Sequence, residues 1–265
     1  MNIVVCVKAV PSTTEVKMDP KTNTIVRDGR ASVVNPFDAT ALEIALQIKD
    51  ERTVAGFPTT VIVLSMGIPA TQELLRDCIA RGADRALLLT DRAFAGADTL
   101  ATTYALACGL RELGTVDLVL CGKMAVDGDT AQIGPELAGS LEASCITDVR
   151  SLVRIDDASV AAWHATDEGT ELIETDLPAV LTVSKDVAQL RMPSIAGVFS
   201  AERATCETCS AAEVAADPSR IGLAGSPTQV VRSFVPERAA SAQVIEGTMD
   251  EQAARVAALI EEAVR

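Results

Sequence analysis

Apolar runs and amphipathic stretches alternate through the first half of the chain. Residues 2–10 form an unbroken run rich in β-branched side chains, which is typical of a strand buried on both faces. Further apolar runs predict strands at 60–64, 85–89 and 117–121, and the stretches between and after them predict helices at 70–80, at 99–113 and from about residue 129. Because this alternation is the signature of βαβ units with right-handed crossovers, we expect a doubly wound α/β domain with a mostly parallel sheet.

A further helix is expected to begin at Asn35. Asn35 is a natural N-cap residue, Pro36 suits the first helical position, and Asp38 places negative charge in the first turn. An apolar stripe follows at helical spacing, made of Phe37, Ala41, Ile44, Ala45 and Ile48. Before this helix, the segments 16–19 and 24–27 flank a polar tetrapeptide and predict a hairpin-like excursion.

The pattern changes in the second half of the chain. Short apolar segments predict antiparallel strands added to the same sheet, at 149–155, 159–164, 171–175 and 179–184. Residues 188–247 carry scattered Pro and Gly and predict an extended arm that lies on another surface. Thr248 and Glu251 form a capping box for a final amphipathic helix. We therefore expect an α/β domain over 1–187 and a partner-binding region over 188–265.

Composition narrows the range of functions. The net charge is −14, which disfavours nucleic acids and anionic membranes as partners. The chain has seven scattered cysteines and one histidine, which suggests a reducing compartment and disfavours sites that need several histidines. The first residues lack the basic and apolar segments of a signal peptide, and no uninterrupted apolar run is long enough to span a bilayer. We expect a cytoplasmic protein without membrane insertion.

The candidate chemistry lies where the predicted parallel strands end. Ligands of open parallel sheets bind beyond the carboxyl ends of the strands, which places Cys6, the turn at 64–67 and the loop at 122–135 at one edge. Asp129 or Thr130 can cap the helix after this loop, and the amides of 130–134 are then free to bind a phosphate. An ordinary capped helix start gives the same pattern, so both interpretations stay open.

Other signatures of chemistry are absent from the sequence. It contains neither a G-x-G-x-x-G fingerprint nor a phosphate-binding P-loop. Cys206 and Cys209 form a lone C-x-x-C without a second pair, so we expect no metal site. His164 belongs to a different segment from any candidate nucleophile, and we expect no catalytic residue.

Ordered segments of the sequence resemble the β subunit of electron-transfer flavoproteins. They read VVCVKAVPSTTEVKMDP, VVNPFDATALEIAL, LVLCGKMAVDGDTAQIGPELA, LPAVLTV and RMPSIAG. The resemblance implies an adenine-nucleotide α-hydrolase-like fold, an α subunit as partner, and an adenine nucleotide in this chain. Carried over by position, the cofactor contacts are Cys6, Asn35, Pro36, Phe37, Asp38, Met66, Ala125, Val126, Asp127, Gly128, Asp129, Thr130, Ala131, Gln132, Ile133, Gly134, Pro135 and Glu136.

The loop at 127–135 reads D-G-D-T-A-Q-I-G-P and resembles the electron-bifurcating subgroup, whose β subunit binds FAD. Ordinary members, which bind AMP, resemble D-D-D-x-N-Q-T-G-Q there. The resemblance implies FAD, with AMP as the alternative. It also implies NADH as donor, an acyl-CoA-type dehydrogenase as partner, and ferredoxin or flavodoxin as low-potential acceptor. Whether the chain counts as an enzyme is left open: it is expected to carry electrons, with NADH oxidation by the αβ heterodimer.

The family's partner-docking loop has a counterpart in this chain, formed by Arg191, Met192, Pro193, Ser194 and Ile195. Met192 occupies the position of the hydrophobic anchor, and a flexible thioether suits entry into a partner pocket. The tripeptide at 188–190 departs from the family's N-E-P, and the lysine cluster usual after the loop is missing. A stand-alone adenine-nucleotide sensor is the rival from another class, and an ATP-using ligase of related fold is disfavoured because no S-G-G-x-D-S loop occurs.

Overall fold

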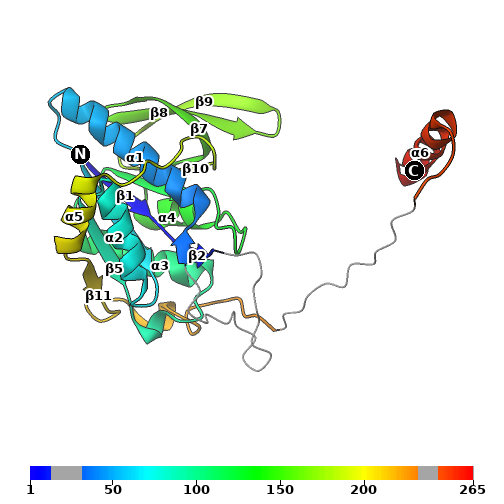
Figure 1. Cartoon of the computed structure of the whole chain (residues 1–265). Coiled ribbons are helices and arrows are strands. Elements are labelled where there is room, and N and C mark those ends of the chain that lie inside the picture. Colours follow the sequence, from blue (N-terminus) through cyan, green and yellow to red (C-terminus); the bar gives the residue numbers. More distant parts are fainter. Residues whose placement is uncertain (13–31, 232–243, 265) are drawn as a thin grey trace. The chain divides into compact units, whose positions relative to one another are not determined.

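The computed structural model describes residues 1–12, 32–231 and 244–264. The chain divides into two compact units, Met1–Val230 and Val231–Arg265. The first unit contains the sheet and its covering helices (Figure 1). The hairpin-like excursion expected over 16–27 lies outside the described residues.

A nine-stranded sheet forms the centre of the first unit, with strand order β11-β5-β4-β1-β6-β10-β7-β8-β9. Neighbours from β11 to β7 pair in parallel, and β8 and β9 extend the sheet in antiparallel fashion beyond β7. The strands are β1 (Asn2–Cys6), β4 (Thr60–Met66), β5 (Arg85–Leu89), β6 (Leu118–Gly122), β7 (Ser144–Ile155), β8 (Ser159–Thr166), β9 (Gly169–Asp176), β10 (Ala179–Val183) and β11 (Glu207–Cys209). A separate two-stranded ribbon pairs β2 (Ala9–Pro11) with β3 (Ser32–Val34).

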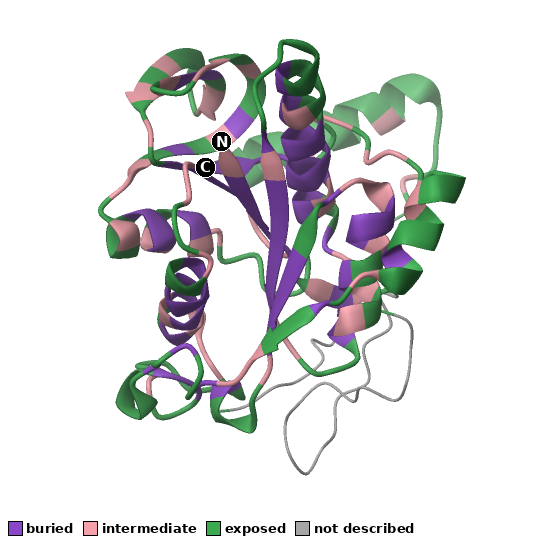
Figure 2. Ribbon diagram, turned by 90° about the vertical axis from the view of Figure 1, so that its left-hand side faces the viewer, coloured by how far each residue is buried: buried purple, intermediate pink, exposed green. Residues whose placement is uncertain are grey.

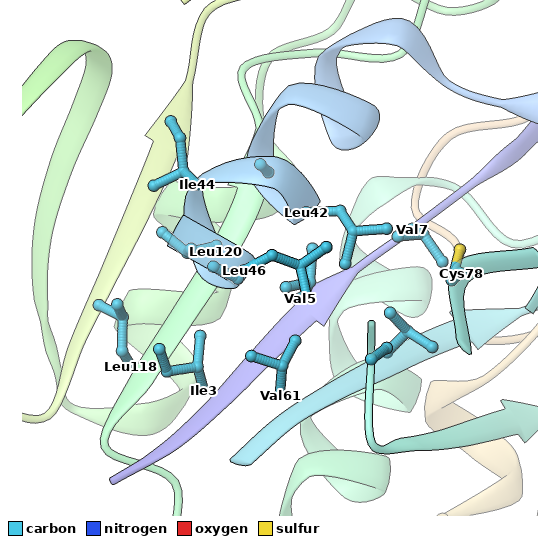
Figure 3. Close-up of a cluster of buried hydrophobic side chains, with 14 of the residues drawn as sticks. Ile3, Val5, Val7, Leu42, Ile44, Leu46, Val61, Cys78, Leu118 and Leu120 are labelled. Carbon is cyan, nitrogen blue, oxygen red and sulfur yellow. The ribbon is translucent and has the colours of Figure 1, made fainter. Parts of the chain in front are cut away.

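Helices cover both faces of the sheet. The first unit has α1 (Pro36–Val54), α2 (Thr71–Arg81), α3 (Thr99–Glu112), α4 (Ile133–Leu141), α5 (Ile195–Arg203) and two 3₁₀ turns, Arg92–Phe94 and Pro218–Arg220. On one face, Leu42 and Leu46 of α1 and Cys78 of α2 pack on Val5 and Leu120 of the sheet (Figure 3). On the other face, side chains of α3 and α4 pack on the alternate residues of the same strands. Figure 2 shows the result: the central strands are buried, and the helices turn exposed faces outward.

The doubly wound, mostly parallel α/β fold is confirmed, and three details differ from expectation. The apolar run at 2–10 is not one strand: β1 ends at Cys6, and residues 9–11 leave the main sheet to form β2. The segment expected as an antiparallel strand at 179–184 is β10, which is parallel to both of its neighbours. All five β10 residues are buried, as is usual for a central strand of a parallel sheet.

The third difference concerns the expected extended arm. Residues 188–230 belong to the first compact unit, because they contain α5, which packs on α2, and β11, which pairs with β5. Small apolar side chains such as Ala201, Cys206 and Val214 are buried there. In the sequence, these three buried residues do not recur at the regular spacing of a helix or a strand, so the pattern did not indicate their burial. The boundary expected at residue 187 therefore does not coincide with the division after Val230.

The second unit contains α6 (Met249–Val264), and its capping box is confirmed. The amide of Thr248 donates to Glu251 Oε2 at 2.8 Å, and the amide of Glu251 lies 3.5 Å from Thr248 Oγ1. Val256 and Ile260 on its apolar stripe are exposed in this chain. Binding of this helix to an α subunit stays a prediction.

Candidate functional site

The chain reverses its direction of travel through the sheet between β1 and β6. After β1 the chain continues into α1 on one face, whereas after β6 it continues into α4 on the other. Cys6, the last residue of β1, aligns with Leu64 of β4 and Cys121 of β6, so these strands end at one level. The loops after β1 and β6 therefore diverge at a topological switch point, where doubly wound proteins bind ligands.

Asn35 connects the start of α1 to the loop after β6. It was expected to cap the helix, but its side chain makes no capping hydrogen bond. Instead its Nδ2 donates to the carbonyl oxygen of Met124 at 2.9 Å, and its Oδ1 accepts from the amide of Val126 at 3.2 Å. The side chain of Asn35 is buried, and both bonds are partly shielded from water. The residue therefore fixes the backbone at the beginning of the candidate cofactor loop.

Asp38 joins the ends of β1 and β6 in a similar way. Its Oδ2 accepts from the amide of Lys8 at 2.8 Å and its Oδ1 from the amide of Gly122 at 3.0 Å. Burial raises the pKa of Asp38 to about 7, against the hydrogen bonds from Lys8, Asn35 and Gly122, which lower it. Asp38 does not cap α1, because both of its carboxylate oxygens accept from loop amides outside the helix.

The loop between β6 and α4 contains two residues in the left-handed region, Asp129 (φ 50°) and Ala131 (φ 53°). Such backbone is costly for residues other than glycine and gathers at functional loops. Left-handed residues cannot be part of a right-handed helix, so α4 begins only after them, at Ile133. No side chain caps α4, so the capping expected from Asp129 or Thr130 is wrong. Lys8 Nζ pairs with Asp127 Oδ1 at 2.6 Å across the switch point.

Free hydrogen-bonding groups gather at this edge of the sheet. Among the bonds of the described residues, the amides of 130–134 donate to no protein acceptor. The hydroxyl of Ser65, the penultimate residue of β4, is buried and has no hydrogen-bond partner within the described chain. Consecutive unpaired amides at the start of a helix match the oxygens of a phosphate or diphosphate. The residues therefore fit the adenine nucleotide or flavin that the sequence resemblance implies.

The glycines of this loop have different roles. A Cβ on Gly134 would lie 2.1 Å from Thr182 Cγ2, so this glycine lets α4 approach β10. A Cβ on Gly128 would meet nothing within 4 Å, and no left-handed φ is required there. Gly128 therefore borders open space and is not required by the packing of the loop.

The structure brings most of the expected cofactor residues to the switch point. Cys6 ends β1, Met66 ends β4, Asn35–Asp38 begin α1, and 125–136 form the loop and first turn of α4. The side chain of Glu136 is held by α3, where Thr103 Oγ1 donates to it at 2.9 Å. Sequence reasoning placed Ser65 and Gly122 at this edge but missed two contacts of the expected residues: Lys8, which binds Asp38 and Asp127, and Thr182, which packs against Gly134. The only sequence signal was that Lys8 is the one charged residue in the apolar run at 2–10.

The residues expected to dock a partner, 191–195, lie apart from the switch point, in the segment that leads into α5 and includes its first residue. The backbone of Arg191 is bound to α1, and Met192 and Ile195 are each 81% exposed. Met192 is therefore not part of the hydrophobic core.

The remaining chemical features of the described residues are their metal-ligating groups, their helices and their thiols. No cluster of three or more histidine, cysteine or acidic side chains there has the arrangement of a metal site. None of the described helices is long and apolar enough to cross a membrane. The cysteines are free thiols, and Cys6, Cys78, Cys108 and Cys121 are buried within apolar stretches of the sequence.

Fold and switch-point geometry define a doubly wound α/β protein with a loop of unpaired backbone amides at the switch point. Comparison with known proteins gives the family. The model of the electron transfer flavoprotein domain matches residues 22–214. A caffeyl-CoA reductase-Etf complex subunit, CarD, of Acetobacterium woodii is 45% identical over 94% of this chain and 93% of its own. The electron transfer flavoprotein subunit beta of Megasphaera elsdenii is 41% identical over 100% and 98%. Protein FixA of Bradyrhizobium diazoefficiens is 41% identical over 93% and 86%.

The chain therefore belongs to the electron transfer flavoprotein family, among its beta subunits. Its role is electron transfer in a flavoprotein system.

Proposed function

We propose that this chain binds FAD at the switch point between β1 and β6 and, with an α subunit, works in flavin-based electron bifurcation. In this proposal, electrons from NADH pass to an acyl-CoA-type dehydrogenase and to a low-potential carrier, ferredoxin or flavodoxin. The observation that carries it is the loop at 127–135, with its D-G-D-T-A-Q-I-G-P sequence and the unpaired amides of 130–134. The 45% identity to a subunit of a caffeyl-CoA reductase-Etf complex supports an acyl-CoA partner class.

The residues of this chain bind and orient the proposed cofactor. The amides of 130–134 would hold its diphosphate at the start of α4, where the helix dipole favours negative charge. Asn35 and Asp38 keep the surrounding loops in place through their bonds to Met124, Val126, Lys8 and Gly122. When bound, the flavin supplies the redox chemistry, and the protein supplies position and electrostatics. No side chain is assigned a proton-transfer role.

The decisive measurement is the cofactor content of the purified αβ heterodimer. Two flavins per heterodimer, with bleaching of both on addition of NADH, are expected. One flavin together with tightly bound AMP would refute the proposal and leave an ordinary electron-transfer flavoprotein. A colourless chain that binds ATP and ignores every α subunit would indicate the nucleotide sensor.

Gly128→Asp tests the loop itself. Ordinary members resemble D-D-D at this point, so the variant restores a carboxylate beside the proposed diphosphate. The structure leaves open space around Gly128, so the substitution adds charge without steric strain. Gly139→Asp in α4 is the matched control, because a Cβ there also meets nothing within 4 Å. Loss of FAD from the first variant but not from the second is expected, and equal FAD content in both would count against the assignment.

A further inference from the structure

The exposed Met192 and the half-buried Pro193 lie between two fixed points of the chain. On its N-terminal side, Arg191 binds α1 and α2. On its C-terminal side, Ser194 caps α5, with its Oγ accepting from the amide of Gly197 at 2.9 Å. A Cβ on Gly197 would lie 2.1 Å from the carbonyl oxygen of Ala80, so α5 contacts α2 closely at this point.

Arg191 makes hydrogen bonds through its backbone amide, its backbone carbonyl and its guanidinium group. Its backbone amide donates to Glu43 Oε2 at 3.0 Å, and its Nε and Nη2 reach the two oxygens of the same carboxylate, each at 3.0 Å. Its Nη1 donates to Asp50 Oδ2 at 2.8 Å, and its carbonyl oxygen accepts from Arg81 Nη1 at 2.5 Å. Both the backbone and the side chain of Arg191 are therefore fixed on the surface formed by α1 and α2.

The carboxylate that receives these bonds is buried. The side chain of Glu43 is 6% exposed, whereas that of Arg191 is 31% exposed. Bidentate Arg–carboxylate pairs give geometric specificity as well as attraction, and a buried charge left without its partner is costly. Burial alone would raise the pKa of Glu43, but the hydrogen bonds from Arg191 hold it below its ordinary value. The pair therefore remains charged at neutral pH.

We propose that the Arg191–Glu43 ion pair holds Met192 and Pro193 in a preformed docking knuckle, and that both charged residues position this knuckle for a partner dehydrogenase. The inference rests on the proposed function for the identity of the partner. Ordering a flexible loop on binding costs conformational entropy, so a preformed knuckle binds its partner more tightly. Because Glu43 is buried, it acts through Arg191 and not by touching the partner.

The first test needs no partner. Hydrogen exchange of the heterodimer is followed in the peptide that contains the Arg191 amide, for wild type and for Glu43→Gln. The Arg191 amide is expected to exchange at least tenfold faster in the variant, while peptides of the 125–136 loop stay unchanged. Arg191→Lys is the second variant: it keeps the positive charge but loses the bidentate hydrogen bonds to Glu43. Faster exchange of the residue-191 amide is expected here too. Unchanged exchange in both variants would overturn the proposal.

The second test measures electron transfer to a purified short-chain acyl-CoA dehydrogenase at varied concentration. Glu43→Gln is expected to raise KM for the dehydrogenase about tenfold with kcat and flavin content unchanged. In a Met192→Ala background the same substitution should have no further effect, since there is no anchor left to position. Arg154→Ala is the control, because it removes an arginine paired with Asp156 and Glu174 on the β7–β9 extension.

The possible failures are distinguishable. If wild type transfers electrons well and Glu43→Gln is unaffected, or if its effect persists undiminished without Met192, the positioning role is wrong. If the wild-type heterodimer gives no transfer to the dehydrogenase, the partner in the proposed function is wrong and the docking role falls with it.

Discussion

The buried carboxyl of Asp38 is expected to make the protein less stable as pH rises through neutrality. Burial raises the pKa of Asp38 from 3.8 to about 7 in the folded chain. The folded state then binds more protons than the unfolded state between these values. Stability from this group is fully present below pH 3.8 and is lost as pH rises through 7.

The size of the effect follows from the pKa difference. About 3 units at 1.36 kcal/mol per unit give about 4 kcal/mol in total. Within the accessible window from pH 5 to pH 7, the loss amounts to about 2 kcal/mol. Asp38→Asn removes the titration, so its unfolding free energy should lack this component. The variant also carries a pH-independent cost of about 1–3 kcal/mol, because one amide, of Lys8 or Gly122, loses its acceptor.

Urea denaturation at fixed protein concentration, repeated from pH 5 to pH 8, separates the pH-dependent loss of unfolding free energy from the pH-independent cost of the substitution. Asp98→Asn is the control, since Asp98 also accepts a backbone amide, that of Ala101, at the start of α3. Although burial raises its pKa, hydrogen bonds from Ala101 and Thr228 lower it overall, so it does not titrate in this window. If wild type and Asp38→Asn lose the same stability from pH 5 to pH 7, the argument from burial is refuted.

Three further predictions concern individual contacts. Gly134→Ala should destabilise the protein by about 1–3 kcal/mol through overlap with Thr182 Cγ2, and Thr182→Ser should partly restore stability in thermal unfolding; equal melting of single and double variants would contradict this. Asn35→Ala should lower the free energy of unfolding by about 1–3 kcal/mol and speed hydrogen exchange at the Val126 amide. Exchange as slow as in wild type would argue against the role of Asn35 in fixing this loop. Thr248→Ala should weaken the first turn of α6 by about 1 kcal/mol, seen as faster exchange near residue 250, whereas unchanged protection would mean that the capping box is dispensable.

The fold was largely predictable because periodicity is a local property. Runs of β-branched residues and amphipathic stretches marked β4, α2, β5, α3 and β6 to within two residues. The position of β10 in the sheet was not predictable in the same way. Its sequence AVLTV shows burial on both faces, but which strands it pairs with depends on a crossover that follows the long antiparallel extension.

The location of the candidate site could also be predicted from strand order, whereas the roles of its side chains could not. Asn35 and Asp38 occupy positions where helix caps are common, and capping preferences describe bonds within a few residues. Their partners Gly122, Met124 and Val126 lie 84–91 residues away in sequence. A local pattern has no information on such bonds, because tertiary packing decides between the two uses of the same side chain.

Helix α1 gives a physical link between the two regions proposed to carry function. Asn35 and Asp38 at its start hold the loops of the cofactor crevice, and Glu43 further along holds the docking knuckle through Arg191. The eight residues from Asn35 to Glu43 correspond to about 12 Å of helix rise. The inner face of α1 is packed on the sheet through Leu42 and neighbouring residues, so this spacing is rigid. The crevice and the knuckle are thereby fixed relative to one another by a single helix, although 55 residues of chain lie between Pro135 and Arg191.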